Sequence, residues 1–247
     1  MVQQHNRVGI VLAGGKGTRL YPLTKVVSKQ LLPVYNKPVI YYPIETLIQT
    51  GHQQIIIITK PEDRDLFKEL ILSNKEWNCE FIFLVQEEPK GLPDAFNVAR
   101  DYIDNKPSTL ILGDNLINAD LSKINFSLNH GAQIFLKKKY NSNQYGVLKM
   151  TKEKKIILLE KPKNSINETV VIGLYLFDSK VCYKVKKLKP SNRGELEIID
   201  LIRMYANEES LNFFKLKKKD IWYDVGSFDN LLECSNYIKK SLNNHKI

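Results

Sequence analysis

The chain has 247 residues, of which 43 % are hydrophobic and 26 % charged, and its formal net charge is +10. This length and composition are typical of a globular protein with a full hydrophobic core. The three cysteines are far apart and form no CxxC pair, so we interpret them as reduced thiols of a cytoplasmic protein rather than disulfide partners or metal ligands. An apolar run at residues 8–13 is too short for a secretion signal or a membrane span, and we expect no membrane association.

The positive charge allows several classes of anionic partner, including nucleic acid, lipid surfaces and phosphorylated small molecules. Nucleic-acid binding needs basic residues interleaved with exposed aromatic residues on one face, whereas the lysine runs at residues 137–139, 186–187 and 217–219 lie beside predicted strands that already have core roles. We therefore expect no nucleic-acid partner. Residues 1–44 contain no Asp or Glu, and this local excess of positive charge suits a polyanionic ligand. The cations of that segment are Arg7, Lys16, Arg19, Lys25, Lys29 and Lys37.

The first half of the chain alternates apolar strands with amphipathic helices. Strands are predicted at residues 8–13, 55–59, 81–85 and 109–112, and helices at 38–50, around 66–71 and at 93–103. Such alternation predicts parallel strands joined by crossover helices.

The second half is richer in strands. They are predicted at residues 133–136, 146–150, 155–159, 170–177, 213–216 and 221–223, and helices at 195–206 and 227–242. In the last helix we expect an inward face of Phe228, Leu231, Leu232, Ser235 and Ile238. Because no repeat or flexible linker interrupts the pattern, we predict one α/β domain over residues 1–247. Its fold would be Rossmann-like, an open, mostly parallel mixed sheet flanked by helices.

A glycine-rich loop follows the first predicted strand, in the sequence GIVLAGGKGTRLYPL (residues 9–23). Glycines let the backbone approach phosphate oxygens, and ligands of open α/β sheets bind beyond the carboxyl ends of the strands. The loop is no Walker A motif, because GxxxxGK[ST] is absent. It is no good dinucleotide fingerprint either, because Leu20 stands where the third glycine belongs and no acid follows about 20 residues on.

The sequence that follows the loop is more specific for one family of proteins. LAGGKGTRLYPLT is followed by SKQLLPVYNKPVIYYP, and this order resembles the nucleotidyltransferases that activate sugar 1-phosphates, most closely the glucose-1-phosphate thymidylyltransferases. Further stretches of the family pattern run through the whole chain. They are QxxPxGL at 86–92, LGDN at 112–115, YGV at 145–147, EKP at 160–162, GLY at 173–175, RGELEI at 193–198 and WYDVG at 222–226.

The resemblance implies the nucleotide-diphospho-sugar transferase fold, with a nucleotide-binding N-terminal half and a sugar-phosphate-binding C-terminal half. It also implies a reaction: a sugar 1-phosphate, in the first place glucose 1-phosphate, attacks the α-phosphorus of dTTP or UTP, and pyrophosphate leaves. Mg²⁺ is the implied cofactor. Positioning and charge stabilisation would supply most of the catalysis, because the attacking phosphate is already anionic.

By the same resemblance, the phosphate-binding groups lie in three motifs. Arg19 and Lys29 would stabilise the reacting phosphates and Lys161 would bind the incoming sugar phosphate. Asp114 and Asp224 would be the Mg²⁺ ligands. The backbone cradle of the triphosphate would be Gly14, Gly15, Gly17 and Thr18.

Two further groups of residues would recognise the base and the sugar. Gln86 carries an amide donor and acceptor that suit the uracil or thymine edge, and Gly91 belongs to the same base-binding motif. Gln86 does not distinguish dTTP from UTP. The residues implied for the sugar phosphate are Gly146, Glu160, Lys161, Ile172 and Arg193.

The sequence departs from the family at three places. Asp94 stands where the family's GLAQA has an amide, and residues 168–172 lack its NYAVT. The chain ends soon after the helix that follows Asp224, where family members carry a helical tail with subunit contacts and a regulatory site. We expect a homo-oligomer, either a dimer or a tetramer. We do not extend the end-product feedback of the family to this chain. A uridylyltransferase for an amino or deoxy sugar 1-phosphate, and a catalytically silent nucleotide-sugar sensor, remain alternatives.

Overall fold

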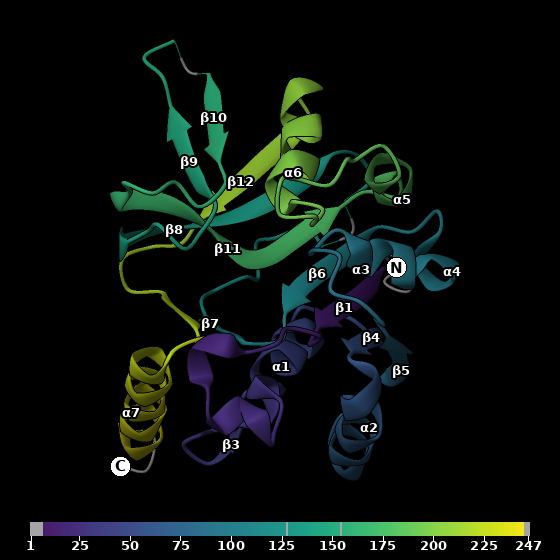
Figure 1. Cartoon of the computed structure of the whole chain (residues 1–247), viewed down its shortest axis with the longest axis vertical. Coiled ribbons are helices and arrows are strands. Elements are labelled where there is room, and N and C mark those ends of the chain that lie inside the picture. Colours follow the sequence, from purple (N-terminus) through teal and green to yellow (C-terminus); the bar gives the residue numbers. More distant parts are fainter. Residues whose placement is uncertain (1–6, 127, 154, 245–247) are drawn as a thin grey trace.

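A computed structural model describes residues 7–126, 128–153 and 155–244 of the chain. A large mixed sheet crosses the molecule, with α1 and α2 on one side and α3, α5 and α6 on the other (Figure 1). Its main path runs in the order β10-β9-β11-β6-β1-β4-β5. These strands are β10 (Ile156–Leu159), β9 (Val147–Met150), β11 (Ile166–Phe177), β6 (Ser108–Leu112), β1 (Val8–Leu12), β4 (Gln54–Thr59) and β5 (Glu80–Val85).

The parallel part of the sheet consists of β6, β1, β4 and β5, and β11 pairs antiparallel with β6. Two more strands extend it: β8 (Ala132–Asn141) pairs antiparallel with β11, and β12 (Leu211–Lys215) pairs parallel with β8. The hairpin of β9 and β10 projects from the antiparallel side (Figure 1). The predicted fold class, an open, mostly parallel mixed sheet flanked by helices, is confirmed.

The helices cover both faces of this sheet because the apolar residues of β1 alternate. Ile10 joins the core beneath α3, α5 and α6, whereas Val11 joins the core beneath α1 and α2. The helices are α1 (Tyr41–Gln49), α2 (Arg64–Ser73), α3 (Asp94–Val98), α4 (Arg100–Ile103), α5 (Val181–Val185), α6 (Ile198–Asn207) and α7 (Phe228–Asn244).

The helix predicted at residues 93–103 is divided in two. α3 ends at Val98 and α4 begins at Arg100, with Ala99 between them outside the α region. The helix predicted at 195–206 begins only at Ile198, because Leu196 makes a β-bridge with Gly91 instead. The second departure arises from a tertiary contact that helix periodicity does not record.

The predicted inward face of the last helix is partly wrong. In α7 the side chain of Cys234 is fully buried, whereas Phe228 and Leu232 are 47 % and 64 % exposed. Leu231 and Ile238 are partly buried and pack against the small core around Val225. The helix therefore contacts the rest of the chain along a narrower stripe than the apolar pattern suggests.

Short elements surround the carboxyl ends of the parallel strands, and the sequence analysis predicted only one of them, the strand at residues 221–223. β7 (Asn115–Asn118) pairs antiparallel with β13 (Ile221–Asp224), and β2 (Pro33–Val34) pairs with β3 (Lys37–Pro38). The described residues also form the 3₁₀ helices η1 (Thr18–Leu20), η2 (Leu23–Lys25), η3 (Lys29–Leu31) and η4 (Pro61–Asp63). η1 and η3 matter most, because they carry Arg19 and Lys29.

Candidate active site

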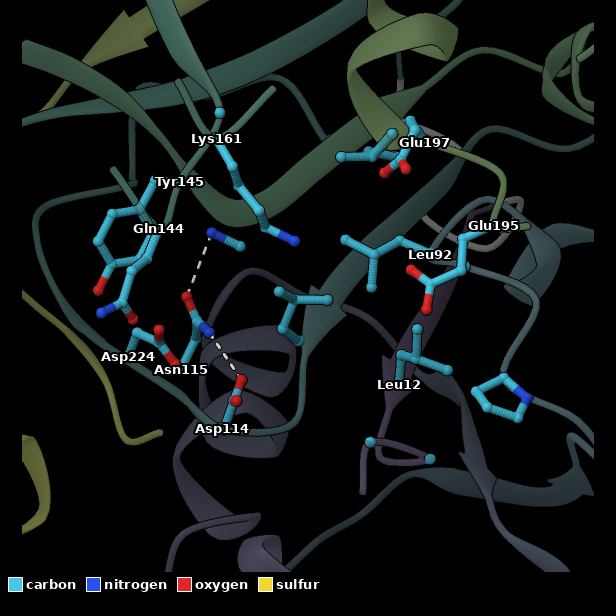
Figure 2. A pocket seen from close by; sticks show the side chains of 18 of the residues that line it. Leu12, Leu92, Asp114, Asn115, Gln144, Tyr145, Lys161, Glu195, Glu197 and Asp224 are labelled. Atoms are coloured by element: carbon cyan, nitrogen blue, oxygen red, sulfur yellow. Dashed lines mark hydrogen bonds between the residues drawn. The ribbon is translucent and has the colours of Figure 1, made fainter. Parts of the chain in front are cut away.

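A cavity of about 500 Å³ lies at the carboxyl ends of β1 and β6 and is lined by residues from both halves of the chain. Figure 2 shows Asp114, Asn115 and Asp224 on one side of it and Lys161 reaching in from another. The cavity brings together most of the residues that the sequence analysis selected. They are Gly14, Gly15, Gly17, Thr18, Arg19, Lys29, Gln86, Gly91, Asp114, Gly146, Glu160, Lys161 and Asp224.

Two selected residues do not line this cavity. The side chain of Ile172 is fully buried in the core on the α1 side of the sheet, while its neighbours Val171 and Gly173 line the cavity. This is the alternation of a strand, so only backbone at Ile172 can face the cavity from β11. Arg193 lies behind the wall and reaches the site through ion pairs with Glu160 and Glu197.

The glycine loop is held open by contacts that need glycine at residue 17. Gly17 has a φ of +63°, and an added Cβ would come within 2.8 Å of Thr24 Cγ2. Thr24 Oγ1 donates a hydrogen bond of 2.9 Å to the Gly17 carbonyl, which fixes the turn into η1. The Lys29 side chain crosses over Gly15, with its Cε 3.4 Å from the Cβ that an alanine there would have. Two cations, Arg19 and Lys29, therefore flank the exposed backbone of the loop.

The two aspartates meet because β7 and β13 pair. Asp224 lies opposite Asn115 in the register of these strands, and Asp114 immediately precedes Asn115. The Val225 amide also donates to the Asp114 carbonyl at 2.8 Å. Residues more than 100 positions apart in the sequence thus present neighbouring carboxylates at the cavity wall.

Lys29 and Asp114 form a buried ion pair, with side-chain exposures of 14 % and 9 %. Burial alone would raise the pKa of Asp114, but the charge of Lys29 and hydrogen bonds from Lys29 and Asn115 outweigh it, so the pKa lies below its usual value. Burial alone would lower the pKa of Lys29, and Asp114 raises it instead. Both groups are therefore charged at neutral pH.

For Asp224, the effects that raise the pKa outweigh those that lower it. Burial and then the negative charge of Asp114 raise its pKa to about 6, against weaker attraction from Lys29 and Arg19. Arg19 Nη2 lies 3.7 Å from Asp224 Oδ2, and Arg19 Nη1 donates to Gln144 Oε1. Two neighbouring buried carboxylates, one of which has a raised pKa, form a site that favours an added cation.

The donor set fits Mg²⁺ bound together with a substrate. No cluster of three or more His, Cys, Asp or Glu side chains with metal-binding geometry occurs in the described part of the chain. Of the acidic residues that line the cavity, Asp114 and Asp224 are the two that the pairing of β7 with β13 brings together. Mg²⁺ commonly binds one or two carboxylates and completes its octahedron with phosphate oxygens and waters. Two carboxylates beside a phosphate-binding loop match that preference.

The base end of the cavity is formed by Gln86 and the loop that follows β5. Gln86 is 7 % exposed, and its Nε2 donates a hydrogen bond of 2.8 Å to Asp94 Oδ2 on α3. Gly91 has a φ of +99° and lies against Leu196, whose carbonyl oxygen would be 2.1 Å from an added Cβ. The Leu196 amide donates to the Lys90 carbonyl at 2.8 Å, which ties this loop to the wall of the second half.

The end of the cavity at which we expect the sugar phosphate, the sugar end, carries alternating charges from residues 160–161 and 193–197. Lys161 Nζ lies 3.4 Å from Glu160 Oε1, and Arg193 Nη2 lies 3.5 Å from the same oxygen and 2.8 Å from Glu197 Oε2. Burial and, more weakly, Glu197 raise the pKa of Glu160, while Lys161 and Arg193 oppose the shift. Gly146 packs directly on Ile199 of α6, where a side chain at residue 146 would clash at 2.5 Å. This end therefore offers cations that can bind a phosphate and carboxylates that can accept hydrogen bonds from hydroxyl groups.

The structure adds residues that the sequence analysis did not select. Asn115 is 1 % exposed and joins three elements: its Nδ2 donates to Asp114, and its Oδ1 accepts from the Gly173 amide and from Trp222 Nε1. Asn115 belongs to the LGDN match and could have been found there. Gln144, which binds Arg19, has no comparable signal in the sequence. Other lining residues without an assigned role include Lys16, Tyr145, Tyr175, Glu195 and Glu197.

A parallel-strand edge with a glycine loop and several cations is typical of α/β proteins that bind anionic substrates, and the paired aspartates suit a metal ion beside such a substrate. The chain belongs to the nucleotidyl transferase family, whose model matches residues 8–241. A glucose-1-phosphate thymidylyltransferase of Xanthomonas campestris is 41 % identical over 238 residues, which cover 94 % of this chain and 81 % of the relative. The corresponding protein of Neisseria meningitidis is 39 % identical, over 94 % of this chain and 82 % of its own. The chain is thus an enzyme, a nucleotidyltransferase.

Solved structures agree with this assignment. A candidate glucose-1-phosphate thymidylyltransferase of Bacillus anthracis, crystallised with sucrose, is 35 % identical with a TM-score of 0.85, and the match covers 94 % of each chain. A UDP-glucose pyrophosphorylase bound to UDP-glucose shares the fold at 24 % identity, with a TM-score of 0.81 over 96 % of this chain and 99 % of its own. Among the described residues, no helix has the length and apolar character needed to span a bilayer.

Proposed function

We propose that this nucleotidyltransferase uses dTTP or UTP as the donor and glucose 1-phosphate as the first candidate acceptor, with Mg²⁺. An oxygen of the sugar phosphate would form a bond to the α-phosphorus, and the bond from that phosphorus to the bridging oxygen of the β-phosphate would break. The products are an NDP-sugar and pyrophosphate. The observation that carries the proposal is one cavity that joins the glycine loop, the amide of Gln86 and the Asp114–Asp224 pair.

In this proposal each end of the cavity has a separate task. The backbone of residues 14–18 binds the triphosphate, and Arg19 and Lys29 stabilise the charge that moves onto pyrophosphate. Lys161 positions the phosphate of the sugar, while Glu160 accepts hydrogen bonds from its hydroxyl groups. Mg²⁺ held by Asp114 and Asp224 would neutralise phosphate charge and orient the reacting oxygens.

The ion pairs of the free enzyme support these roles. Arg19 lies near Asp224, and Lys29 is paired with Asp114. If a metal ion takes the two carboxylates, both cations are released to bind phosphate oxygens. Each released cation then offsets part of the phosphate charge, which limits the cost of burying the charges of the substrates.

Pyrophosphate release tests the proposal directly. The purified chain is mixed with Mg²⁺, glucose 1-phosphate and one of dTTP, UTP, CTP, ATP or GTP. We expect release with dTTP, UTP or both, and none when Mg²⁺ is chelated. If glucose 1-phosphate is inactive, amino and deoxy sugar 1-phosphates are the next acceptors. If no pair of substrates releases pyrophosphate, the proposal is contradicted and a catalytically silent nucleotide-sugar sensor is favoured. A cytoplasmic location, where nucleoside triphosphates are available, accompanies the proposal.

A further inference from the structure

The side chain of Asp94 has no role in the proposed chemistry, yet it contacts the residue proposed to read the base. Its two oxygens have separate partners: Oδ2 accepts from Gln86 Nε2 at 2.8 Å, and Oδ1 accepts from Asn97 Nδ2 at 3.1 Å. Asp94 lies in the first turn of α3, and Asn97 is on the same helix. The carboxylate is therefore fixed from its own helix and directed at the amide.

A carboxylate partner determines which way this amide faces. An ionised carboxylate only accepts hydrogen bonds, so the Gln86 NH₂ group must face Asp94 and Oε1 must face away. Oε1 points towards the glycine loop, because it would lie 3.3 Å from a Cβ placed on Gly14. Oε1 accepts no hydrogen bond from the described residues. Gln86 and Gly14 both line the cavity. One acceptor and the second N–H remain for a ligand.

We propose that Asp94 is a positioning residue that makes the site selective for uracil or thymine over cytosine, by locking the amide of Gln86. The inference rests on the proposed function in that a pyrimidine nucleotide binds at this end. Uracil and thymine present a carbonyl acceptor at C4 beside an N3–H donor, which match the N–H and Oε1 of the locked amide. Cytosine presents the reverse order. A cytosine held at the same place would require the flipped amide, with Oε1 against the carboxylate of Asp94.

Equilibrium binding of UTP and CTP tests the lock without turnover. Titration calorimetry with Mg²⁺ and no sugar 1-phosphate gives the ratio of the two dissociation constants for the wild type and for Asp94→Asn. An asparagine side chain can donate or accept, so both amide orientations become available. We expect UTP preference in the wild type and a fall in that ratio of about 5- to 100-fold in the variant, the range for one mispaired buried group. The exposed Asp101 on α4 offers a charge-matched control, Asp101→Asn, that should keep the ratio.

A double-mutant cycle separates positioning from a structural role. In the Gln86→Ala background, Asp94→Asn should leave the UTP-to-CTP ratio unchanged, because no amide remains to be oriented. The inference is overturned if Asp94→Asn weakens the binding of UTP and CTP equally and so keeps the wild-type ratio. It is also overturned if Asp94→Asn changes the ratio in the Gln86→Ala background. A wild type that binds the two nucleotides equally or binds neither would overturn it as well. A wild type that prefers UTP but releases no pyrophosphate contradicts the proposed function alone.

Discussion

The two ends of the cavity are built differently. At the nucleotide end, the loop of residues 14–19 follows a single buried strand, and Arg19 of this loop and Lys29 of η3 face the aspartates proposed to bind the metal ion. At the sugar end, Lys161 and Arg193 come from separate segments and are paired with glutamates of the cavity wall. The first end carries charges that must be exchanged for metal and phosphate. The second carries a preformed set of alternating charges.

This difference teaches where mutations should act. Loss of a charge at the nucleotide end should reduce turnover, because those groups would stabilise charge that appears in the transition state. Loss of a cation at the sugar end should mainly weaken binding of the acceptor. The Gly91–Leu196 bridge joins the ends, so each substrate is expected to bind more tightly when the other is present.

The largest expected effect is at Asp114. Asp114→Asn should lower kcat at least about 10²- to 10³-fold, because one metal ligand and the partner of Lys29 are both lost. Steady-state pyrophosphate release measures this, and circular dichroism checks the fold. Asp229→Asn, an exposed residue on α7, is the matched control and should keep normal activity. Normal turnover in a folded Asp114→Asn protein would remove Asp114 from the site.

The next effect tests the sugar end. Lys161→Met should raise the KM for the sugar 1-phosphate about 10- to 100-fold, because one charge-assisted hydrogen bond is lost. The KM for the nucleotide should change little. Lys163→Met removes an exposed lysine two residues away and should leave both constants unchanged. If Lys161→Met weakened the nucleotide instead, the division between the two ends would be wrong.

A smaller effect on stability is expected at Asp224. Its pKa is about 6 in the folded protein against an ordinary value of 3.8, so the folded state binds this proton more tightly than the unfolded chain. The resulting stabilisation is fully present below about pH 4 and is lost as the pH rises through about 6. At pH 8 without Mg²⁺, Asp224→Asn should therefore unfold with a free energy about 1–3 kcal/mol higher than the wild type.

Urea unfolding at pH 4 and pH 8 measures that difference, which should shrink at the lower pH. Added Mg²⁺ should stabilise the wild type more than the variant, since the variant lacks one carboxylate. Equal stability of the two proteins at pH 8 would show that burial and the charge of Asp114 do not raise the pKa of Asp224.

The smallest effect is expected at Arg193. This residue does not line the cavity and acts through Glu160 and Glu197, so Arg193→Gln should raise the KM for the sugar 1-phosphate less than about tenfold. A loss as large as that of Lys161→Met, measured in the same assay, would mean that Arg193 contacts the substrate itself.

Local sequence was enough to predict the strand–loop unit at the nucleotide end. A buried strand that breaks into glycines and cations specifies a phosphate-binding turn through backbone freedom and charge, and both are properties of adjacent residues. The alternation of strands and helices likewise predicted the sheet, because one face of each element must be buried. The resemblance supplied the distant residues, such as Asp224, one by one.

Tertiary structure decided the relations between distant residues. The pairing of β7 with β13 places Asp224 opposite Asn115, and neither short strand has enough apolar periodicity to be predicted as a pair. The exposure of Phe228 and Leu232 depends on the narrow contact of α7, which the apolar pattern of one helix does not determine. Side-chain contacts of this kind depend on where whole elements pack.

Asp94 combines the two levels. The sequence determined that a carboxylate replaces the family's amide, and thereby that this position can only accept hydrogen bonds when ionised. Only the packing of α3 against the end of β5 decided that the acceptor faces Gln86. The chemistry of a residue is set by its side chain, whereas its partner is set by the fold, because a hydrogen bond requires two groups within about 3 Å.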